Sequence, residues 1–397
     1  MIKLSERINK ITESQTLAMT KMGRALGAKG IDIISLSIGE PDFDTPKHII
    51  EAAKKAMDEG YTHYTPVAGF PDLREAISHK FKRDNNLDYK PEQIVVSTGA
   101  KHSLMNTFLC VLNTGDDVII PTPYWVSYTD MVNHCDGITV KIPTSIDNDY
   151  LPSIEQIKEA ISPKTKAIIF SSPCNPSGTV YPKDLLQEIA NVVAQNPQMI
   201  VISDEIYEHI NYTEEHHSIG AFENIKDQVV TVNGLAKGFA MTGWRIGYVG
   251  APLILAQAIE KLQGQYTSGT NSIAQRAAIT ALGDNLTPTK EMKKVFLERR
   301  KIILDLLEDI PTVKNNIPNG AFYVFPDVSY YFGKSFGDYI INNANDLSMY
   351  LLNEGHVTVV SGSAFGMDEC IRISYAASEE KIREAIKRIK TALYKLQ

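Results

Sequence analysis

The stretch MIVISDEIYE, residues 199–208, changes from an apolar run to polar residues within one position and places two carboxylates there. A short run rich in branched apolar residues is typical of a buried β-strand. A carboxylate at the end of such a strand is costly to bury unless a positive group faces it. The stretch therefore predicts a buried strand and, beyond its end, a cation that pairs with Asp204 or Glu205.

Five further runs of the same kind lie along the chain, with helical or turn sequence between them. They are QIVVSTG (93–99), DDVIIPTP (116–123), GITVKIP (137–143), KAIIFSSP (166–173) and QVVTVNG (228–234). A helix is expected at PKHIIEAAKKAMDEG (46–60), because a proline stands near its first turn and a glycine ends it. Strands that alternate with helices predict an α/β fold with a doubly wound, mostly parallel sheet.

The pattern changes after about residue 285. A long charged helix (291–309) leads to short strand-like runs, and another helix (378–396) closes the chain. This order predicts a smaller α+β domain. The first 44 residues form no complete unit and are expected to pack against it. We therefore expect a large domain at 45–285 and a small domain made of 1–44 and 286–397, which closes over the functional site.

The composition argues against several classes of function. The 397-residue chain has a formal net charge of -7, with its charges spread along the chain, which disfavours binding to nucleic acid or an anionic membrane. Four cysteines lie far apart, at Cys110, Cys135, Cys174 and Cys370, so we expect neither a disulfide framework nor a metal site. Neither a signal-peptide core nor a membrane-spanning run is evident. These features favour a cytoplasmic protein.

Several unusual residues fall after the expected strands, where open α/β sheets bind their ligands. Gly99 joins a strand to a helix whose first amides can hold a phosphate. Lys237 stands among small and apolar residues, where an amine can lose its proton and act as a nucleophile. Taken singly, these motifs fit a tight turn and a solvated lysine equally well, and a carboxylate at position 204 fits a helix cap.

In combination the motifs indicate pyridoxal 5'-phosphate (PLP). This cofactor needs a lysine for its Schiff base, a carboxylate opposite its pyridine nitrogen and an anion site for its phosphate. Lys237, Asp204 and the turn at Gly99 can supply these groups, and Arg245 adds a cation. The carboxylate at the end of residues 199–208 would then face a pyridinium.

The chain resembles the fold-type I PLP enzymes of the class I/II aminotransferase family, and most of all their bacterial aspartate aminotransferase branch. The matching motifs are GEPDFDTP (39–46), YWVSY (124–128), SPCNPSG (172–178), SDEIYE (203–208) and NGLAKGFAMTGWRIGY (233–248). The resemblance covers essentially the whole chain. The resemblance implies a homodimer with shared active sites that transfers the amino group of L-aspartate to 2-oxoglutarate. The transfer would use a ping-pong cycle between PLP and pyridoxamine phosphate.

The resemblance also implies roles for single residues. Lys237, Asp204 and Tyr207 are the expected catalytic residues, and Glu205 has no comparable role in the family. Besides these three, the residues expected at the cofactor are Asn175 at its phenolic oxygen, Trp125 on its ring, Gly99, Ala100, Lys101 and Arg245 at its phosphate, and Tyr64 from the other subunit. The residues expected at the substrate are Arg372, which would grip the α-carboxylate with a bidentate fork, Lys101 at the distal carboxylate, Gly39, Trp125, Asn175 and Thr16.

Other functions of the same scaffold remain open. A transaminase of this family with prephenate or arogenate, aromatic amino acids or alanine as its main substrate is one alternative, and a PLP-dependent C–S β-lyase is another. A transcription regulator is disfavoured, because 44 residues are too few for a DNA-binding domain ahead of the large one. Relatives that use prephenate typically show KPSxT near the N-terminus. This chain has TESQT at 12–16, without the Lys-Pro pair, so aspartate is expected to be strongly preferred.

Overall fold

The computed structural model describes residues 2–283, 285–310 and 312–397. Its centre is a seven-stranded sheet of order β2-β8-β7-β6-β5-β3-β4, in which β8 alone runs antiparallel to both of its neighbours. The strands are β2 (Ile94–Ser97), β3 (Asp117–Pro121), β4 (Ile138–Ile142), β5 (Thr165–Ser171), β6 (Ile200–Asp204), β7 (Val229–Gly234) and β8 (Gly247–Gly250). The sheet confirms the expected α/β class with a mostly parallel arrangement.

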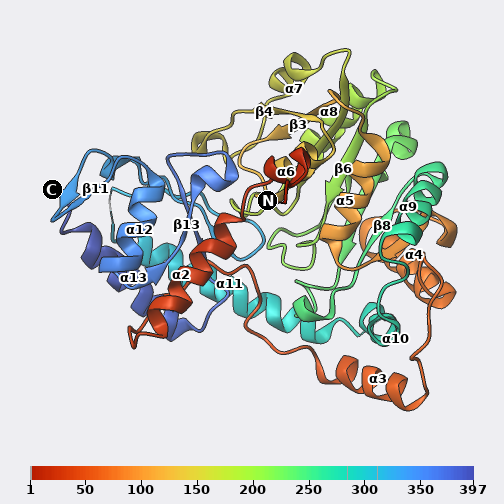
Figure 1. Ribbon diagram of the computed structural model, residues 1–397, viewed down its shortest axis with the longest axis horizontal. Coiled ribbons are helices and arrows are strands. Elements are labelled where there is room, and N and C mark those ends of the chain that lie inside the picture. The colour runs from red at the N-terminus through yellow and green to blue at the C-terminus, as the bar shows by residue number, and fades with distance from the viewer. Residues whose placement is uncertain (1, 284, 311) are drawn as a thin grey trace.

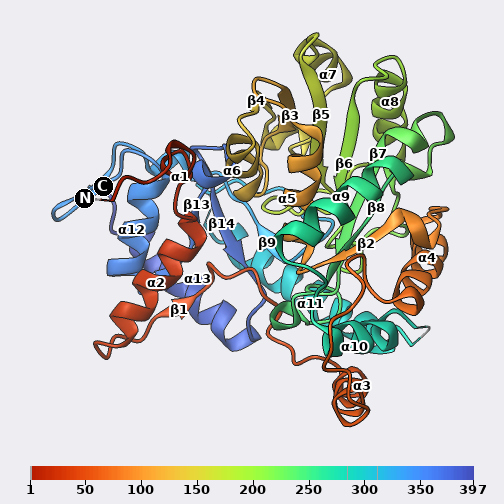
Figure 2. The ribbon, with the colours of Figure 1, turned by 45° about the vertical axis from the view of Figure 1, so that its right-hand side comes forward.

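Helices cover both faces of this sheet because neighbouring residues of each strand point to opposite sides. In β6, for example, Val201 packs into one apolar cluster and Ile202 into another. On the Ile202 side lie α5 (Ala100–Val111), α6 (Ser127–His134) and α9 (Leu253–Tyr266). On the opposite side lie α3 (Lys47–Asp58), α4 (Pro71–Asn85), α7 (Ile154–Ala160), α8 (Lys183–Ala194) and α10 (Ser272–Leu282) (Figure 2).

A second apolar core lies beside the sheet and joins residues from both ends of the sequence. Ile34 and Leu36 pack there with residues of the last 110 positions, and β1 (Ile34–Ser35) pairs in parallel with β12 (Val357–Thr358). The remaining strands are β9 (Tyr323–Val324), β10 (Ser335–Phe336), β11 (Tyr339–Ile340), β13 (Val360–Ser361) and β14 (Ile371–Ser374). The remaining helices are α1 (Glu6–Asn9), α2 (Gln15–Gly27), α11 (Thr287–Glu308), α12 (Ala344–Glu354) and α13 (Glu379–Leu393).

The two cores form two lobes, with α11 extending between them and α2 on the smaller lobe (Figure 1). This arrangement supports the division of the chain near residues 44 and 285, although those boundaries stay a prediction. Within the described ranges, no helix has the length and apolar run that a bilayer crossing would require.

Candidate active site

A cavity of about 410 Å³ lies at the carboxyl edge of the large sheet, where residues from both lobes line it. Strands β5, β6 and β7 run parallel and end there, which brings Asn175, Asp204 and Lys237 together from loops that are far apart in sequence. Arg372 and Tyr323 enter the same cavity from the smaller lobe. The lining also includes Thr16, Gly39, Ala100, Lys101, Trp125, Tyr207 and Arg245. Most of the residues expected at the site are thus gathered in one place.

Lys237 presents its amine to this cavity. It stands in the turn after β7, and its Nζ donates a hydrogen bond to the carbonyl of Gly39. Burial lowers the pKa of Lys237 to about 8, and the positive charge of Arg372 acts in the same direction. An amine with that pKa is neutral in a substantial fraction of molecules near neutral pH, which is what a nucleophile or a general base requires.

Asp204 lies at the end of β6 and is almost completely buried, with 4% of its surface exposed. Its Oδ2 accepts a hydrogen bond of 2.7 Å from the Tyr128 hydroxyl, and its Oδ1 accepts one of 3.3 Å from the amide of Ile206. Burial raises the pKa of Asp204 to about 6, although the Tyr128 hydrogen bond lowers it in part. A carboxylate held in this way is stabilised as an anion when a cation lies opposite it.

Arg372 joins the two lobes at the cavity. Its Nη1 donates to Asn175 Oδ1 at 2.9 Å, and its Nη2 donates to the carbonyl of Ser37 at 2.6 Å. Its guanidinium stacks over the Tyr323 ring at 4.5 Å, and the side chain is buried. The Nε atom is buried and has no hydrogen-bond partner among the residues that the structure describes. A buried donor of this kind calls for an acceptor, and a carboxylate can bind a guanidinium through two parallel bonds.

Tyr323 contacts Tyr207 and limits the space at Gly39. The Tyr207 hydroxyl and the Tyr323 hydroxyl are 2.7 Å apart, and both rings are buried. A Cβ atom on Gly39 would approach the Tyr323 oxygen to 2.3 Å. Position 39 therefore has no room for a side chain, and its backbone can come close to whatever lies beside Lys237.

An anion site is present at the start of α5. Gly99 has a φ of +86° and precedes the helix, so the first amides of α5 lack intrahelical acceptors and point outward. The Arg245 guanidinium packs so closely on Gly99 that a Cβ there would lie 2.4 Å from Nη2. The Lys101 ammonium lies 4.9 Å from the centre of the Trp125 ring. The Arg245 guanidinium and the first amides of α5 together suit a phosphate, and the Lys101 ammonium adds a second positive charge to the cavity lining.

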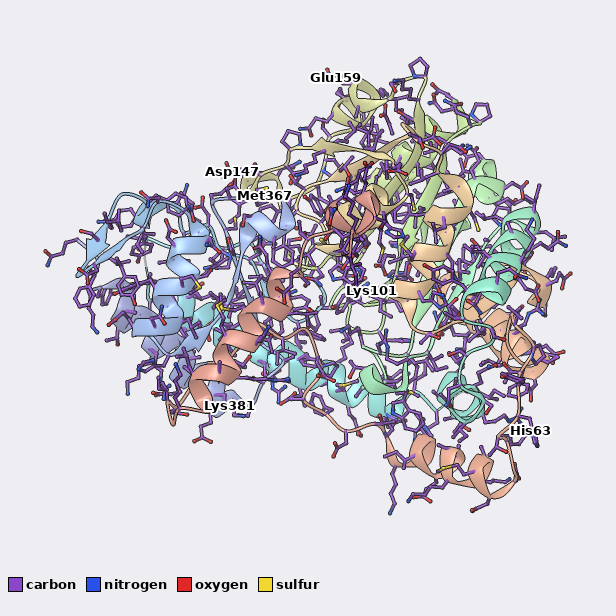
Figure 3. The ribbon with its side chains drawn as sticks, viewed as in Figure 1. His63, Lys101, Asp147, Glu159, Met367 and Lys381 are labelled. Carbon is purple, nitrogen blue, oxygen red and sulfur yellow. The ribbon has the colours of Figure 1, made fainter. Side chains whose placement is uncertain are left out.

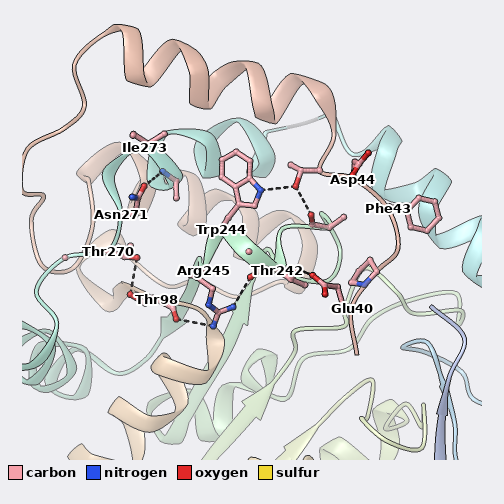
Figure 4. A pocket seen from close by; sticks show the side chains of 16 residues that line it. Glu40, Phe43, Asp44, Thr98, Thr242, Trp244, Arg245, Thr270, Asn271 and Ile273 are labelled. Carbon is pink, nitrogen blue, oxygen red and sulfur yellow. Dashed lines mark hydrogen bonds between the residues drawn. The ribbon is translucent and has the colours of Figure 1, made fainter. Parts of the chain in front are cut away.

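Arg245 also borders a second, more open cavity of about 730 Å³ (Figure 4). There its Nη1 donates to the carbonyl of Thr242 at 3.0 Å and its Nη2 donates to that of Thr98 at 3.4 Å.

Burial lowers the pKa of Lys101, and the charge of Arg245 lowers it further. Lys101 itself lies near the middle of the molecule (Figure 3).

Of the other two residues expected at the site, Thr16 lines the cavity and Tyr64 does not. Thr16 lines the cavity from the first turn of α2, beside Ser14 and Leu17. Tyr64 is 98% exposed and does not line the cavity of its own chain. Its expected role at the phosphate of another subunit stays a prediction.

The sequence analysis missed two residues that shape the site. Tyr128 was part of a quoted motif, YWVSY, but its bond to Asp204 was not expected. It stands in the first turn of α6, three residues after Trp125, and the centres of the two rings lie 5.5 Å apart. Tyr323 lies in the run AFYVF (321–325), and nothing in that run distinguishes a tyrosine at the cavity from one in the core.

Comparison with known proteins adds independent findings. The family model described as aminotransferase class I and II matches residues 31–389. A Petunia hybrida protein named bifunctional aspartate aminotransferase and glutamate/aspartate-prephenate aminotransferase is 47% identical over 99% of this chain and 83% of its own length. The crystal structure of an aspartate aminotransferase from Rhizobium meliloti superposes with a TM-score of 0.96, at 38% identity and full coverage of both chains. The Thermus thermophilus aspartate aminotransferase with maleate gives a TM-score of 0.93, at 39% identity over 99% of this chain and 100% of that one.

Proposed function

Because the chain belongs to the class I and II aminotransferases, we propose that it binds PLP at Lys237 and transfers the amino group of L-aspartate to 2-oxoglutarate. The products are oxaloacetate and L-glutamate. The observation that carries this proposal is the shared cavity, in which an amine of lowered pKa, Lys237, meets Asp204 and the partly unpartnered guanidinium of Arg372.

The residues of the cavity fit PLP. Gly99, Arg245 and the first amides of α5 suit its phosphate, and the buried Asp204 suits its pyridinium nitrogen. Asn175 and Tyr207, with amide and hydroxyl groups at the cavity wall, suit its phenolic oxygen. When bound, PLP would supply an electron sink for the charge left at the substrate Cα.

The protein itself would bind the substrate and move its protons. Arg372 would bind the α-carboxylate, since its Nε is a buried donor in need of an acceptor. Lys237 would remove the proton from the substrate Cα and later return a proton, because a base of pKa about 8 can serve in both directions near neutral pH. Asp204 would keep a negative charge opposite the cofactor nitrogen, and Tyr128 would hold its carboxylate in place.

Aspartate needs a second cation for its distal carboxylate. Lys101 is the candidate, because its ammonium lies over Trp125 in the lining of the same cavity. The Thermus thermophilus relative with maleate supports a site for two carboxylates, since maleate is a dicarboxylate of similar length. The name of the Petunia hybrida relative makes prephenate a second candidate substrate. Against it, position 13 carries an exposed glutamate where prephenate-using relatives have the proline of the Lys-Pro pair.

We further propose that the enzyme is a homodimer in which Tyr64 completes the site of the other subunit, and that it works in the cytoplasm. The first proposal has support from the exposure of Tyr64 and from the family, and the second from the wide spacing of the four cysteines in the sequence, which is not that of a disulfide framework.

The test is a direct assay on protein reconstituted with PLP. L-Aspartate and 2-oxoglutarate are added, and oxaloacetate is measured by its reduction with a coupling dehydrogenase. Without the oxo acid a transaminase forms at most one equivalent of oxaloacetate per site and with it turns over repeatedly, whereas a β-lyase releases pyruvate and ammonia from cysteine-like substrates without it. Prephenate replaces 2-oxoglutarate in a parallel reaction, with glutamate as donor. Failure of aspartate to react, with faster turnover of another donor, would contradict the assignment of substrate.

A further inference from the structure

Behind the end of β6 lies a buried polar cluster that the proposed mechanism does not use. Glu205 and Glu208 follow directly after Asp204 and Tyr207, yet neither glutamate lines the cavity. Their exposed fractions are 1% and 7%. With partners from α4 and from the loop after Tyr212 they form a cluster that we call the Glu205 network, and its members are Lys80, Asn85, Glu205, Glu208 and His216.

Asn85 connects the two glutamates and the lysine. Its Oδ1 accepts a hydrogen bond of 2.6 Å from Lys80 Nζ, which leaves its Nδ2 as a donor toward both carboxylates. That nitrogen lies 2.9 Å from Glu205 Oε2 and 2.7 Å from Glu208 Oε2. Lys80 in turn forms an ion pair with Glu208, and neither its side chain nor that of Asn85 reaches solvent appreciably. Lys80 therefore supplies a buried positive charge beside Glu208.

His216 is the partner of the other carboxylate. Its Nε2 lies 2.9 Å from Glu205 Oε2, while Glu205 Oε1 accepts hydrogen bonds from Ser203 at 2.9 Å and Ser218 at 2.6 Å. Burial lowers the pKa of His216, but the hydrogen bond and charge of Glu205 outweigh this and raise it above its ordinary value. The charged or titratable groups that act on the imidazole are Glu205, Glu208 and His209 on its own side and Lys80 on α4, and Asp84 lies 3.9 Å from Lys80.

The network thus contains two ion pairs, Lys80 with Glu208 and His216 with Glu205. Removing one member of a buried pair leaves an uncompensated charge, whereas removing both is often tolerated. The uncompensated charge would lie next to the site, because Glu205 follows Asp204 in the chain and its negative charge acts on that carboxylate. His216 is the one cation of the network that can lose its charge near neutral pH.

We propose that His216 is a positioning residue of the active site, which holds the segment 204–208 through Glu205 and compensates the negative charge behind Asp204. This inference rests on the proposed function, because it assigns the effect of His216 to a cofactor held by Asp204. His216 would position this segment and compensate the charge without contacting a substrate or a cofactor.

The experiment compares the variants His216→Gln, Glu205→Gln and the double variant, each loaded with PLP. The absorbance of the bound cofactor is titrated against pH, and thermal unfolding of the cofactor-free proteins is recorded as a separate readout. His216→Gln leaves the negative charge of Glu205 uncompensated. This charge stabilises the protonated form of the bound cofactor, so the pH midpoint of its absorbance change should rise by about half a unit. In the double variant two neutral side chains replace an ion pair without net charge, so the midpoint should return to that of the parent protein and the unfolding temperature should recover in part.

If charge compensation is the cause, adding Glu205→Gln to His216→Gln should restore the midpoint. If the first substitution had simply damaged the fold, the second would increase the damage. Glu223→Gln, in the exposed ion pair with Lys226, is the control and should leave the midpoint unchanged. If His216→Gln fails to fold, Ser218→Ala takes its place, since it removes one hydrogen bond from Glu205 and should raise the midpoint less. A folded His216→Gln without a shift, a double variant that keeps the shift, or a double variant that does not fold would each overturn the proposal. A parent protein that binds no PLP would instead contradict the proposed function.

Discussion

The segment 204–208 has carboxylates on both of its sides, and the two sides differ in how far their polar groups are partnered within the protein. Toward the cavity, Asp204 and Tyr207 lie beside Lys237 and Arg372, whose polar groups are not all partnered within the protein. Toward α4, the carboxylate of Glu205 accepts four hydrogen bonds, from Asn85, Ser203, His216 and Ser218. Both sides are buried, but the Glu205 carboxylate has its partners within the protein, whereas Nε of Arg372 has none among the described residues.

The difference indicates how a buried polar region can be interpreted. A structural network stabilises the fold only if every charge has a partner, because an unpaired buried charge is costly. A binding site instead leaves donors unpaired and shifts the pKa values of its groups until a ligand arrives. Substitutions in the cavity should therefore affect activity more than stability, and substitutions in the Glu205 network should do the reverse.

The largest effect is expected from Lys237→Ala. The amine and the base are the same group, so turnover of aspartate should fall by about a thousandfold or more, on the order of 4 kcal/mol of barrier. Stability of the cofactor-free protein should hardly change, because the lowered pKa of Lys237 shows that its charge is not stabilised where it lies. Steady-state kinetics and urea unfolding give the two values. Residual activity within tenfold of the parent would contradict the role of Lys237.

The network should show the opposite behaviour in Lys80→Met. This change leaves Glu208 buried without its cation, so the free energy of unfolding should fall by about 3 kcal/mol or more. The matched control is Lys54→Met, in an exposed pair with Glu51, which should cost about 0.5 kcal/mol or less. Urea unfolding of the cofactor-free proteins measures both. Equal losses would mean that the network contributes no more than a surface pair.

The pH dependence of cofactor attachment tests the cavity side of the segment 204–208 through the amine of Lys237. Only the neutral amine of Lys237 can attack a carbonyl, and the fraction of neutral amine rises with pH through its pKa of about 8. The rate of attachment of PLP to the cofactor-free protein should therefore fall about tenfold for each unit below pH 8. Stopped-flow absorbance gives this rate. A midpoint near 10.5, the ordinary value for lysine, would mean that burial does not activate this amine.

A smaller and selective effect is expected from Lys101→Ala. If its ammonium binds the distal carboxylate, kcat/KM for aspartate should fall by about tenfold more than kcat/KM for alanine, which has no such group. Part of the Lys101 residue is exposed to solvent and burial of its ammonium opposes the charge, so stability should change little. Equal losses for the two amino acids would show that Lys101 does not distinguish them.

The smallest expected change is the activity recovered in hybrid dimers, which tests whether the two subunits share their active sites. If Tyr64 serves the other subunit, mixing Tyr64→Ala with Lys237→Ala should produce hybrid dimers in which one site carries both defects and the other neither. Random exchange in a dimer predicts recovery of about a quarter of the parent activity. Each variant alone is the control, and exchange is confirmed by native mass measurement. No recovery after confirmed exchange would place Tyr64 outside the shared site.

Much of the fold was predictable because the strand signals are local. Each of the expected runs from QIVVSTG to QVVTVNG contains a strand of the large sheet. The strand β8 was not expected, since Gly247 and Gly250 make its sequence resemble a turn. Position 247 has to be glycine because a Cβ there would lie 2.1 Å from the amide of Ala100, which couples β8 to the start of α5.

The candidate site was predictable for a different reason. Motifs such as NGLAKGF combine residue types that PLP chemistry needs, and they lie at the ends of strands. The structure brings Lys237, Asp204, Asn175 and Arg372 into one cavity, although their roles there stay proposals. No local signal identified Tyr128 or Tyr323 as partners of the expected residues, because each bond crosses between segments that are distant in sequence.

By itself the sequence determined the strands, the helices and the chemical groups available at the strand ends, since these depend on side-chain type and short-range spacing. It also determined that a carboxylate pair ends β6. Only the tertiary structure decided which carboxylate faces which environment. Asp204 meets the cavity and Glu205 meets Asn85, from 120 positions away, because successive residues leave a strand end on opposite sides and packing of α4 decides what each of them finds there.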